Sequence, residues 1–259
     1  MTSWRKRCLT SCASWWQTNN HAMISKRLLK YWYPDHRKNG TQIFYDWVRE
    51  HIDPEHRILN VGAGPISRSP VKVFRGEVAR VVGVDIDPIV LENPELDEAF
   101  VSDGVTLPFG DCSFDIAVSD YVFEHVKSPA PFLKEIRRIL KPGGSLFFRT
   151  PNRYHYVSLV GRFTPHWFHT LVANRVRGLP SDAHEPYETY YRLNSAGQVR
   201  RLATEALFSR VELRHVEVEP SYLMFSTVPF LAGVLYERIV NCSHGLSGLR
   251  ANVFGRLIR

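Results

Sequence analysis

Two glycines follow directly on a short apolar run in the stretch ILNVGAGPISRSP, residues 58–70. In a strand–turn–helix unit, Gly62 would permit a tight turn and Gly64 would let the backbone approach a ligand closely, because neither residue has a Cβ. A dinucleotide fingerprint requires a third glycine three residues later, and Ser67 stands there instead. The two glycines alone therefore indicate either a ligand loop or a simple turn at the end of a strand.

Two carboxylates stand where later apolar runs end. Asp85 closes the run VVGVD and lies 23 residues after Gly62. A carboxylate there, beside a glycine loop, can accept hydrogen bonds from both hydroxyls of a ribose, although helix N-capping is the alternative role. Asp103, followed by Gly104, closes the next run and could accept an adenine amino proton. The two acids favour a ligand that contains a nucleoside.

The elements that must position these residues alternate along the chain. Apolar runs at 57–64, 79–87, 98–104, 114–118 and 145–150 predict five strands. The segment 129–144 predicts a helix, because its apolar residues recur at steps of three and four before Pro142-Gly143-Gly144. Strands that are apolar on both faces and separated by helices imply a parallel sheet covered on both sides.

The C-terminal part follows a different pattern. Residues 194–208 predict a helix with Asn194 or Ser195 as N-cap, and residues 209–219 alternate as an antiparallel strand does. The segment YLMFS, 222–226, is the predicted partner of that strand, and Val228–Val240 is predicted as a last helix.

Residues 58–151 resemble the class I S-adenosylmethionine-dependent methyltransferases, in particular the broad family that includes ubiquinone-biosynthesis and many small-molecule methyltransferases. The resemblance rests on the order and spacing of ILNVGAG, VVGVDID, SDGVTLPFGDCSFDIAVSDYVFEHV and LKEIRRILKPGGSLFFRTPN. It implies an α/β fold with a doubly wound, mostly parallel seven-stranded Rossmann-like sheet, an antiparallel C-terminal strand and an inserted helical cap. It also implies S-adenosylmethionine as the cofactor.

The resemblance assigns roles to individual residues. Asp85 would hold the ribose hydroxyls, Ile86 would pack on adenine, and Ser119 would face the methionine end. The implied cofactor-binding set is Asn60, Gly62, Ala63, Gly64, Asp85, Ile86, Asp103, Gly104 and Ser119. Family members usually carry Asp or Glu at the position of Asn60, so this chain keeps a hydrogen-bonding group there but loses a charge.

Methyl transfer from a sulfonium needs alignment above all, and it needs a general base only when the acceptor is protonated. Some ubiquinone-pathway relatives hold a metal on a Glu-x-x-Glu-His pattern. Here Glu124 and His125 match its end, but Tyr121 replaces its first Glu, so no metal site is predicted. The base candidates are His125, His155 and His184, and a structural role is the alternative for His125.

Four units follow along the chain. They are a basic N-terminal extension and helix (1–40), the cofactor core (41–151), a His- and aromatic-rich acceptor cap (152–193), and the completion of the sheet plus a terminal helix (194–259). Residues 1–38 hold eight Lys or Arg against one acid, residues 39–150 carry a net charge of −5, and residues 151–259 carry +5. Basic ends suit an anionic surface or substrate, although solvated surface charge is the alternative.

The expected function is methyl transfer from S-adenosylmethionine to the oxygen of a small-molecule or lipid- or glycan-linked acceptor. A nucleic-acid methyltransferase and a non-catalytic cofactor-binding protein of the same fold are the alternatives. Four cysteines without a disulfide or zinc spacing favour a reducing compartment, so a cytoplasmic protein is expected. The apolar stretch 222–236 is too short to span a bilayer, and it predicts either core packing or peripheral contact with the inner face of the membrane.

Overall fold

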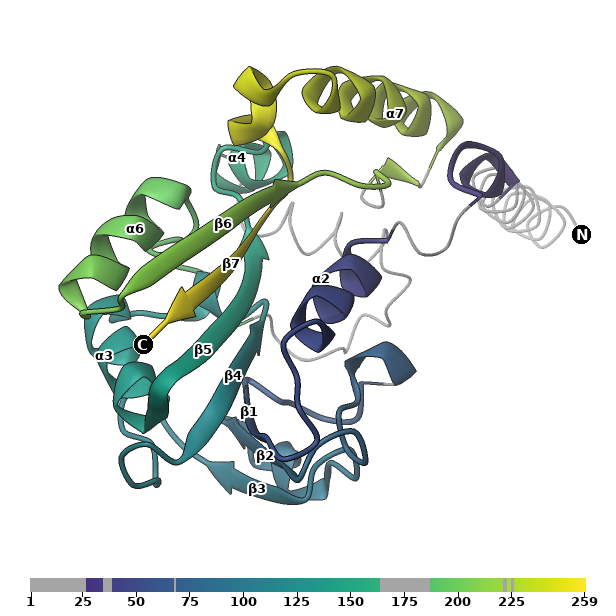
Figure 1. Ribbon diagram of the computed structural model, residues 1–259. Helices are drawn as coiled ribbons and strands as arrows, with labels where there is room; N and C mark the ends of the chain where they lie inside the picture. The colour runs from purple at the N-terminus through teal and green to yellow at the C-terminus, as the bar shows by residue number, and fades with distance from the viewer. Residues whose placement is uncertain (1–26, 35–38, 68, 164–186, 221–222, 225) are drawn as a thin grey trace, which may run out of the picture.

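A seven-stranded sheet forms the centre of the computed structural model, which describes residues 27–34, 39–67, 69–163, 187–220, 223–224 and 226–259 (Figure 1). The strand order is β3-β2-β1-β4-β5-β7-β6. The strands are Arg57–Val61 (β1), Arg80–Asp85 (β2), Glu98–Val101 (β3), Phe114–Asp120 (β4), Leu140–Pro151 (β5), Arg210–Val216 (β6) and Asn252–Ile258 (β7). This is the doubly wound, mostly parallel sheet that the sequence predicts.

The first five strands are parallel, and their register brings the carboxyl ends of β1, β2 and β4 to one edge. Val61 lies level with Val84 of β2 and with Ser119 of β4. Because ligands of open α/β sheets bind outside the carboxyl ends of the strands, this edge is where a cofactor is expected.

The C-terminal strand corrects one sequence prediction. The predicted partner of β6, YLMFS, lies partly outside the described residues, and residues 223 and 224, which are described, are not in a strand. β6 pairs antiparallel with β7, and β7 also pairs antiparallel with β5. The chain therefore ends in a strand after its last long helix, Thr227–Asn241 (α7), rather than in a terminal helix. Val253, Phe254 and Leu257 are buried, so β7 contributes to the core on both faces of the sheet.

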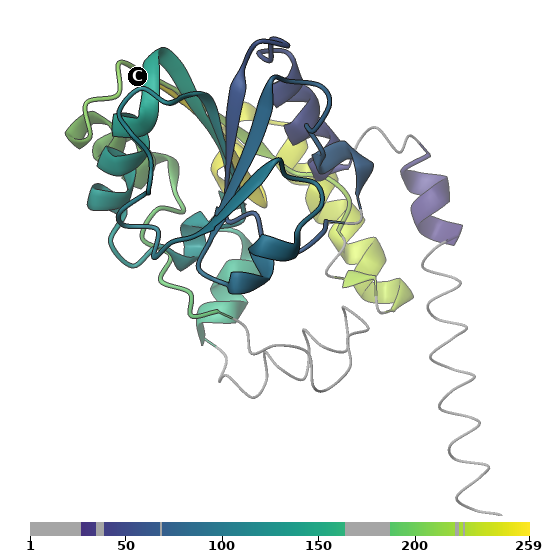
Figure 2. The same ribbon diagram turned by 90° about the horizontal axis from the view of Figure 1, so that it is seen from below.

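Helices cover the two faces of the sheet. Pro129–Ile139 (α3) and Ala196–Glu205 (α6) pack on one face, and Gly40–Arg49 (α2) packs on the other (Figure 2). The side chain of Ser195 accepts a hydrogen bond from the Gln198 amide, which makes Ser195 the N-cap of α6. Short 3-10 helices connect the rest, at Pro70–Lys72 (η2), Pro88–Glu92 (η3), Phe123–His125 (η4) and His244–Leu249 (η6).

Two further helices lie beyond the end of β5, where Figure 1 shows them at the top of the molecule. They are Tyr156–Phe163 (α4) and α7, and Tyr156 meets Tyr236 of α7 edge to face with ring centroids 4.9 Å apart. Among the residues that the structure describes, no helix is both long and apolar enough to cross a bilayer.

Candidate cofactor and acceptor site

The glycine loop is fixed to the end of β2 by backbone hydrogen bonds. The amides of Gly62 and Ala63 both donate to the carbonyl of Val84, at 2.8 and 3.1 Å. One oxygen of the Asp85 carboxylate accepts from the Gly64 amide at 2.8 Å, and the other accepts from the Asp87 amide at 2.9 Å. Asp85 therefore holds the loop in place, and a carboxylate has lone pairs to spare for ligand hydroxyls.

The two glycines meet different requirements, and both fit a ligand cradle. Gly62 has φ +72°, and a Cβ added there would lie 2.2 Å from a methyl carbon of Val122. Gly64 has φ +54°, and an added Cβ would have only the Asp85 carboxylate nearby, at 3.9 Å. The backbone at Gly64 is thus open on the side where a ligand must approach, while Gly62 lets the loop pack closely against the segment after β4.

The other residues of the predicted cofactor set lie at the same edge of the sheet. Ile86 follows Asp85 and is 55% exposed, which leaves an apolar surface for a planar ring. Asp103 is exposed, and its carboxylate accepts from the amides of Val105 and Thr106, which holds its pKa below the usual range. Ser119 at the end of β4 is buried, and its hydroxyl has no hydrogen-bond partner among the described residues.

A short segment, residues 187–191, crosses from the end of β2 to the end of β4. The hydroxyl of Tyr187 donates to the carboxylate of Asp87 at 3.1 Å, and the carbonyl of Glu188 lies 3.0 Å from Nδ1 of His125. The amide of Tyr190 donates to the carbonyl of Glu124 at 2.7 Å. The end of the predicted acceptor cap therefore borders the predicted cofactor site, an arrangement that no local sequence pattern signals.

His125 is the predicted base that this crossing segment orients. A carbonyl oxygen can only accept a hydrogen bond, so Nδ1 must carry the proton that it donates to Glu188. In the neutral ring, Nε2 is then unprotonated and able to accept a proton. The Tyr187 ring stands edge-on to the imidazole at 6.0 Å between ring centroids and fixes its plane further.

Comparison with known proteins agrees with this geometry. A family model described as a methyltransferase domain matches residues 59–148. A probable S-adenosylmethionine-dependent methyltransferase of Mycolicibacterium smegmatis is 36% identical over 146 residues, which cover 49% of this chain and 54% of that protein. A ubiquinone biosynthesis O-methyltransferase of Pseudomonas putida is 27% identical over 132 residues, which cover 46% of this chain and 54% of the relative.

The fold agrees as well. The crystal structure of an S-adenosylmethionine dependent methyltransferase from Mesorhizobium loti matches with a TM-score of 0.54 at 15% identity, covering 85% of this chain and 100% of that one. Residues 59–148 are a class I S-adenosylmethionine-dependent methyltransferase domain. The chain spans only about half the length of the two curated relatives above.

The methyltransferase cofactor is S-adenosylmethionine, and the residues present fit it. The open backbone at Gly64, the Asp85 carboxylate and the exposed Ile86 side chain supply a hydrogen-bonding and an apolar surface side by side. In the described part of the chain, no group of three or more His, Cys, Asp or Glu side chains could hold a metal ion. The individual contacts predicted for the cofactor-binding set stay predictions.

The remaining base candidates of the methyltransferase are placed differently. His155 is buried, with Nε2 3.4 Å from the Glu217 carboxylate and Nδ1 3.4 Å from the Val157 amide, and burial lowers its pKa to about 4. Both ring nitrogens of His155 therefore face the protein itself. His184 lies outside the described residues.

Glu124 is a buried carboxylate at this edge that sequence reasoning passed over as a base. Its carboxylate accepts from the Thr150 hydroxyl at 3.1 Å, and the same hydroxyl accepts from the side-chain amide of Asn194 at 2.5 Å. Burial raises the pKa of Glu124 from 4.5 to about 7. The network ties η4 to β5 and to the start of α6, and the only sequence signal for it is a glutamate beside an apolar run.

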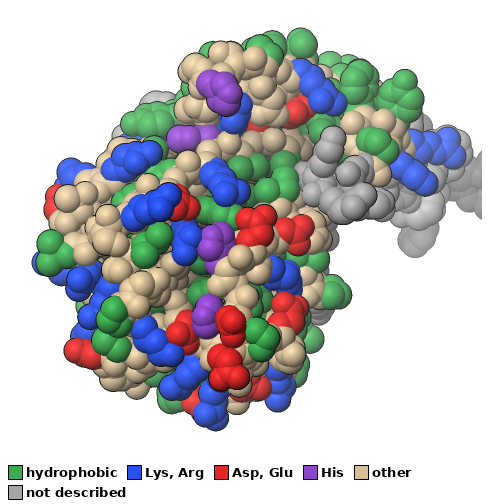
Figure 3. Space-filling view, in the orientation of Figure 1, with side chains coloured by type: hydrophobic (Ala, Val, Ile, Leu, Met, Phe, Trp, Pro, Cys, Tyr) green, Lys and Arg blue, Asp and Glu red, His purple; other side chains and the backbone are tan. Residues whose placement is uncertain are grey.

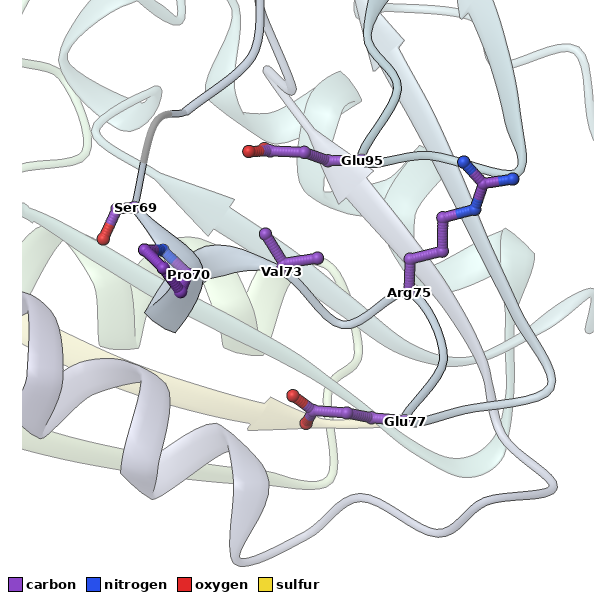
Figure 4. Close-up of a pocket in the computed structure, with 6 residues that line it drawn as sticks. All are labelled: Ser69, Pro70, Val73, Arg75, Glu77 and Glu95. Atoms are coloured by element: carbon purple, nitrogen blue, oxygen red, sulfur yellow. The ribbon is translucent and has the colours of Figure 1, made fainter.

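A surface depression beside η2 is distinct from the cofactor edge. Figure 4 shows its lining, which consists of Ser69, Pro70, Val73, Arg75, Glu77 and Glu95. Its charged groups already have partners: Arg75 binds Asp97, Glu77 binds Arg49, and Glu95 accepts from Ser67. Ser67, which replaces the third glycine of a dinucleotide loop, donates to the Glu95 carboxylate from both its amide and its hydroxyl.

We expect the protein to lose stability as pH rises through neutrality. Burial raises the pKa values of Glu124 and Glu217 to about 7, so the folded chain binds more protons than the unfolded chain between pH 4.5 and 7. Their stabilising effect is complete below pH 4.5 and is lost as pH rises through 7. His155, with its lowered pKa, acts in the opposite sense, but only below about pH 6.5.

Urea unfolding between about pH 6.5 and 8.5 covers the range in which the two glutamates lose their protons in the folded chain. Each of them should lower the free energy of unfolding by about 1 kcal/mol over that window. Glu124→Gln and Glu217→Gln should each remove half of the slope, while Glu205→Gln, at an exposed ion pair with Arg201, should leave it unchanged. A wild-type stability that is flat across the window would contradict the raised pKa values of both buried groups.

Proposed function

We propose that this chain transfers the methyl group of S-adenosylmethionine to a hydroxyl oxygen of a small-molecule or lipid-linked acceptor. One observation carries the proposal: residues 187–188 join the cradle at the end of β2 to an oriented imidazole at the end of β4. The proposed cofactor site and the proposed proton acceptor would thus share one edge of the sheet. The relative named as a ubiquinone biosynthesis O-methyltransferase supports an oxygen acceptor.

Little chemistry is required of the protein in this proposal. S-adenosylmethionine supplies an activated methyl group, and Asp85 with the Gly64 amide would hold its ribose. His125 Nε2 would accept the proton of the acceptor hydroxyl as that oxygen takes the methyl group, whose bond to the sulfonium sulfur would break to leave S-adenosylhomocysteine. The imidazolium so formed keeps its Nδ1–H bond to the Glu188 carbonyl, which retains the orientation of the ring.

The proposal also assigns a role to each part of the chain and a location in the cell to the protein. Residues 41–151 would bind the cofactor, residues 152–193 would form the acceptor cap, and residues 1–40 and 194–259 would complete the fold. A lipid-linked acceptor fits a cytoplasmic enzyme that works at the inner face of the membrane, because the acceptor would be presented there.

Substitution of His125 tests the proposed base. His125→Gln should lower kcat by about 10²–10⁴-fold, because proton transfer is lost while alignment remains. The affinity for S-adenosylhomocysteine, measured by calorimetry, should stay unchanged. His244→Gln is the matched control, since His244 is an exposed histidine in η6.

A series of phenolic acceptors with falling hydroxyl pKa values separates a base from a structural residue. The loss of kcat in His125→Gln should shrink as the acceptor becomes more acidic, because an ionised oxygen needs no base. An equal loss for every acceptor, or no loss for any, would rule His125 out as the base.

The nucleic-acid alternative predicts a different response to salt. Labelled methyl transfer to extracted lipids dispersed in neutral detergent, and to prenylated or unprenylated phenols in the same detergent, should be insensitive to salt. Transfer to RNA or DNA should fall steeply with added salt, because phosphate contacts release counterions. Label in nucleic acid alone would replace the small-molecule proposal. Binding of S-adenosylhomocysteine without transfer to any acceptor would favour the non-catalytic reading.

A further inference from the structure

α7 is apolar on the side that faces away from the protein. Phe230, Gly233, Val234, Glu237 and Val240 are its buried residues. The opposite side is a stripe of four large apolar residues at steps of three and four, with exposed fractions of 76% at Val228, 41% at Leu231, 62% at Leu235 and 49% at Ile239. A helix on the surface of a soluble protein usually presents polar residues there.

Helical residues 27–32 extend this surface with aromatic and basic side chains. Tyr31 is 77% exposed and Trp32 is 39% exposed. The following residue, Tyr33, fixes the segment to α7, because its hydroxyl donates to Glu237 at 3.2 Å and its ring lies under the Arg238 guanidinium, 5.9 Å from the ring centroid. The outer stripe of α7 together with residues 27–32 is called the α7 face below.

The charges on the α7 face have one sign. Arg27, Lys30 and Arg238 are exposed, and Nε of Arg238 also pairs with the Glu237 carboxylate at 3.3 Å. Glu237, the one acid within residues 27–32 and α7, is buried and bonded to Tyr33 and Asn241. Figure 3 shows hydrophobic side chains along the top of the molecule, over α7, with Lys and Arg beside them. An apolar stripe with Trp and Tyr, flanked only by basic groups, is the composition of helices that lie in the interface of anionic bilayers.

We propose that the α7 face docks on an anionic lipid bilayer. The apolar stripe would enter the headgroup–acyl boundary, and the basic side chains would contact lipid phosphates. α4 and α7 lie beyond the end of β5, so docking would bring the surface of the bilayer to the side of the molecule that carries the predicted acceptor cap. The inference is independent of methyl transfer, because docking needs no cofactor.

Vesicle co-sedimentation without cofactor tests the proposal on the full chain. Large vesicles of phosphatidylcholine with phosphatidylglycerol should bind the wild type at least about tenfold more strongly than vesicles of phosphatidylcholine alone, since each basic residue at the surface adds to the attraction. Leu231→Asn/Leu235→Asn should weaken binding to the anionic vesicles at least about tenfold. Arg27→Gln/Lys30→Gln should weaken it by about tenfold as well.

Leu207→Asn is the matched control, because Leu207 is an exposed leucine, at 71%, in the turn after α6 and outside the α7 face. It should bind vesicles as the wild type does. Calorimetry with S-adenosylhomocysteine on the same samples distinguishes a loss of docking from a loss of the folded, ligand-binding protein. A variant of the α7 face should bind S-adenosylhomocysteine as the wild type does.

Three results would overturn the proposal. Equal binding to both kinds of vesicle would exclude the basic contribution, and no binding to either would exclude docking. The third is a wild-type dimer in analytical ultracentrifugation that Leu231→Asn/Leu235→Asn converts to a monomer, because a second copy of the chain would then cover the α7 face.

Discussion

Replacement of Gly62 by alanine is expected to abolish measurable binding of S-adenosylhomocysteine. Alanine at φ +72° is strained, and its Cβ would lie 2.2 Å from a methyl carbon of Val122, so the loop or the Val122 side chain must move. Movement of the loop would separate the Gly64 amide from the Asp85 carboxylate, which lie 2.8 Å apart in the structure. We expect at least about a 100-fold loss of affinity by calorimetry, equivalent to about 3 kcal/mol.

Gly76 offers a matched control for the strain alone. It has φ +86°, but a Cβ there would meet nothing within 4 Å. Gly76→Ala should therefore lower stability by about 1–2 kcal/mol, as alanine in a left-handed conformation does, and leave the affinity for the ligand unchanged. If folded Gly62→Ala binds the ligand as tightly as the wild type, the loop is not the cofactor cradle.

The positions of Gly62, Asp85 and Asp103 could be predicted from the sequence for a physical reason. Each stands within a few residues of a strand end, and a parallel sheet brings the carboxyl ends of its strands together whatever else the chain does. The local sequence pattern is therefore enough to predict that these three residues lie near one another. The same reasoning places His125 just beyond β4 but says nothing about what its ring contacts.

Other features depend on contacts between distant parts of the chain. The tautomer of His125 is set by the Glu188 carbonyl, which is 63 residues away. The sequence pattern does not reveal β7 because Asn252–Ile258 contains Gly255, which weakens a strand pattern. The structure gives the reason for that glycine: a Cβ would lie 2.1 Å from the Phe148 ring across the sheet.

The apolar stretch 222–236 is compatible both with core packing and with peripheral membrane contact. The structure explains why the sequence pattern does not decide between them. α7 has one buried face and one exposed face, and both are apolar. Hydrophobicity alone does not separate core packing from an interface when a helix carries apolar residues all round.

A second large effect is expected from substitution of Arg149. This residue lies near the carboxyl end of β5, on the face of the sheet that α2 covers. Its guanidinium pairs with the Asp120 carboxylate through two nitrogens, and its third nitrogen donates to the Thr41 hydroxyl at 3.0 Å. Arg149 is 4% exposed and Asp120 is 8% exposed. Burial alone would raise the pKa of Asp120, but Arg149 and Lys72 hold it below the ordinary value, so the carboxylate is charged in the fold.

Arg149→Met should lower the free energy of unfolding by about 3–5 kcal/mol, because it leaves a buried carboxylate without its main partner. Lys72, at 2.8 Å from the same carboxylate but partly exposed, can replace only part of that interaction. Chemical denaturation measures the loss. A change below about 1 kcal/mol would mean that Lys72 and the Tyr45 hydroxyl suffice to stabilise Asp120.

The double variant Asp120→Asn/Arg149→Met separates the lost ion pair from lost packing. Because removal of both charges leaves no uncompensated buried group, it should be more stable than Arg149→Met alone. The proposed active site should respond as well, since the guanidinium lies 4.6 Å from the centroid of the Tyr121 ring, just before η4. Both variants lack the guanidinium beside the Tyr121 ring. For that reason the orientation of His125 should change more than the position of the glycine loop at β2. We therefore expect kcat to fall in both variants while affinity for S-adenosylhomocysteine is retained, and an equal loss of both would place the ion pair under the cofactor cradle instead.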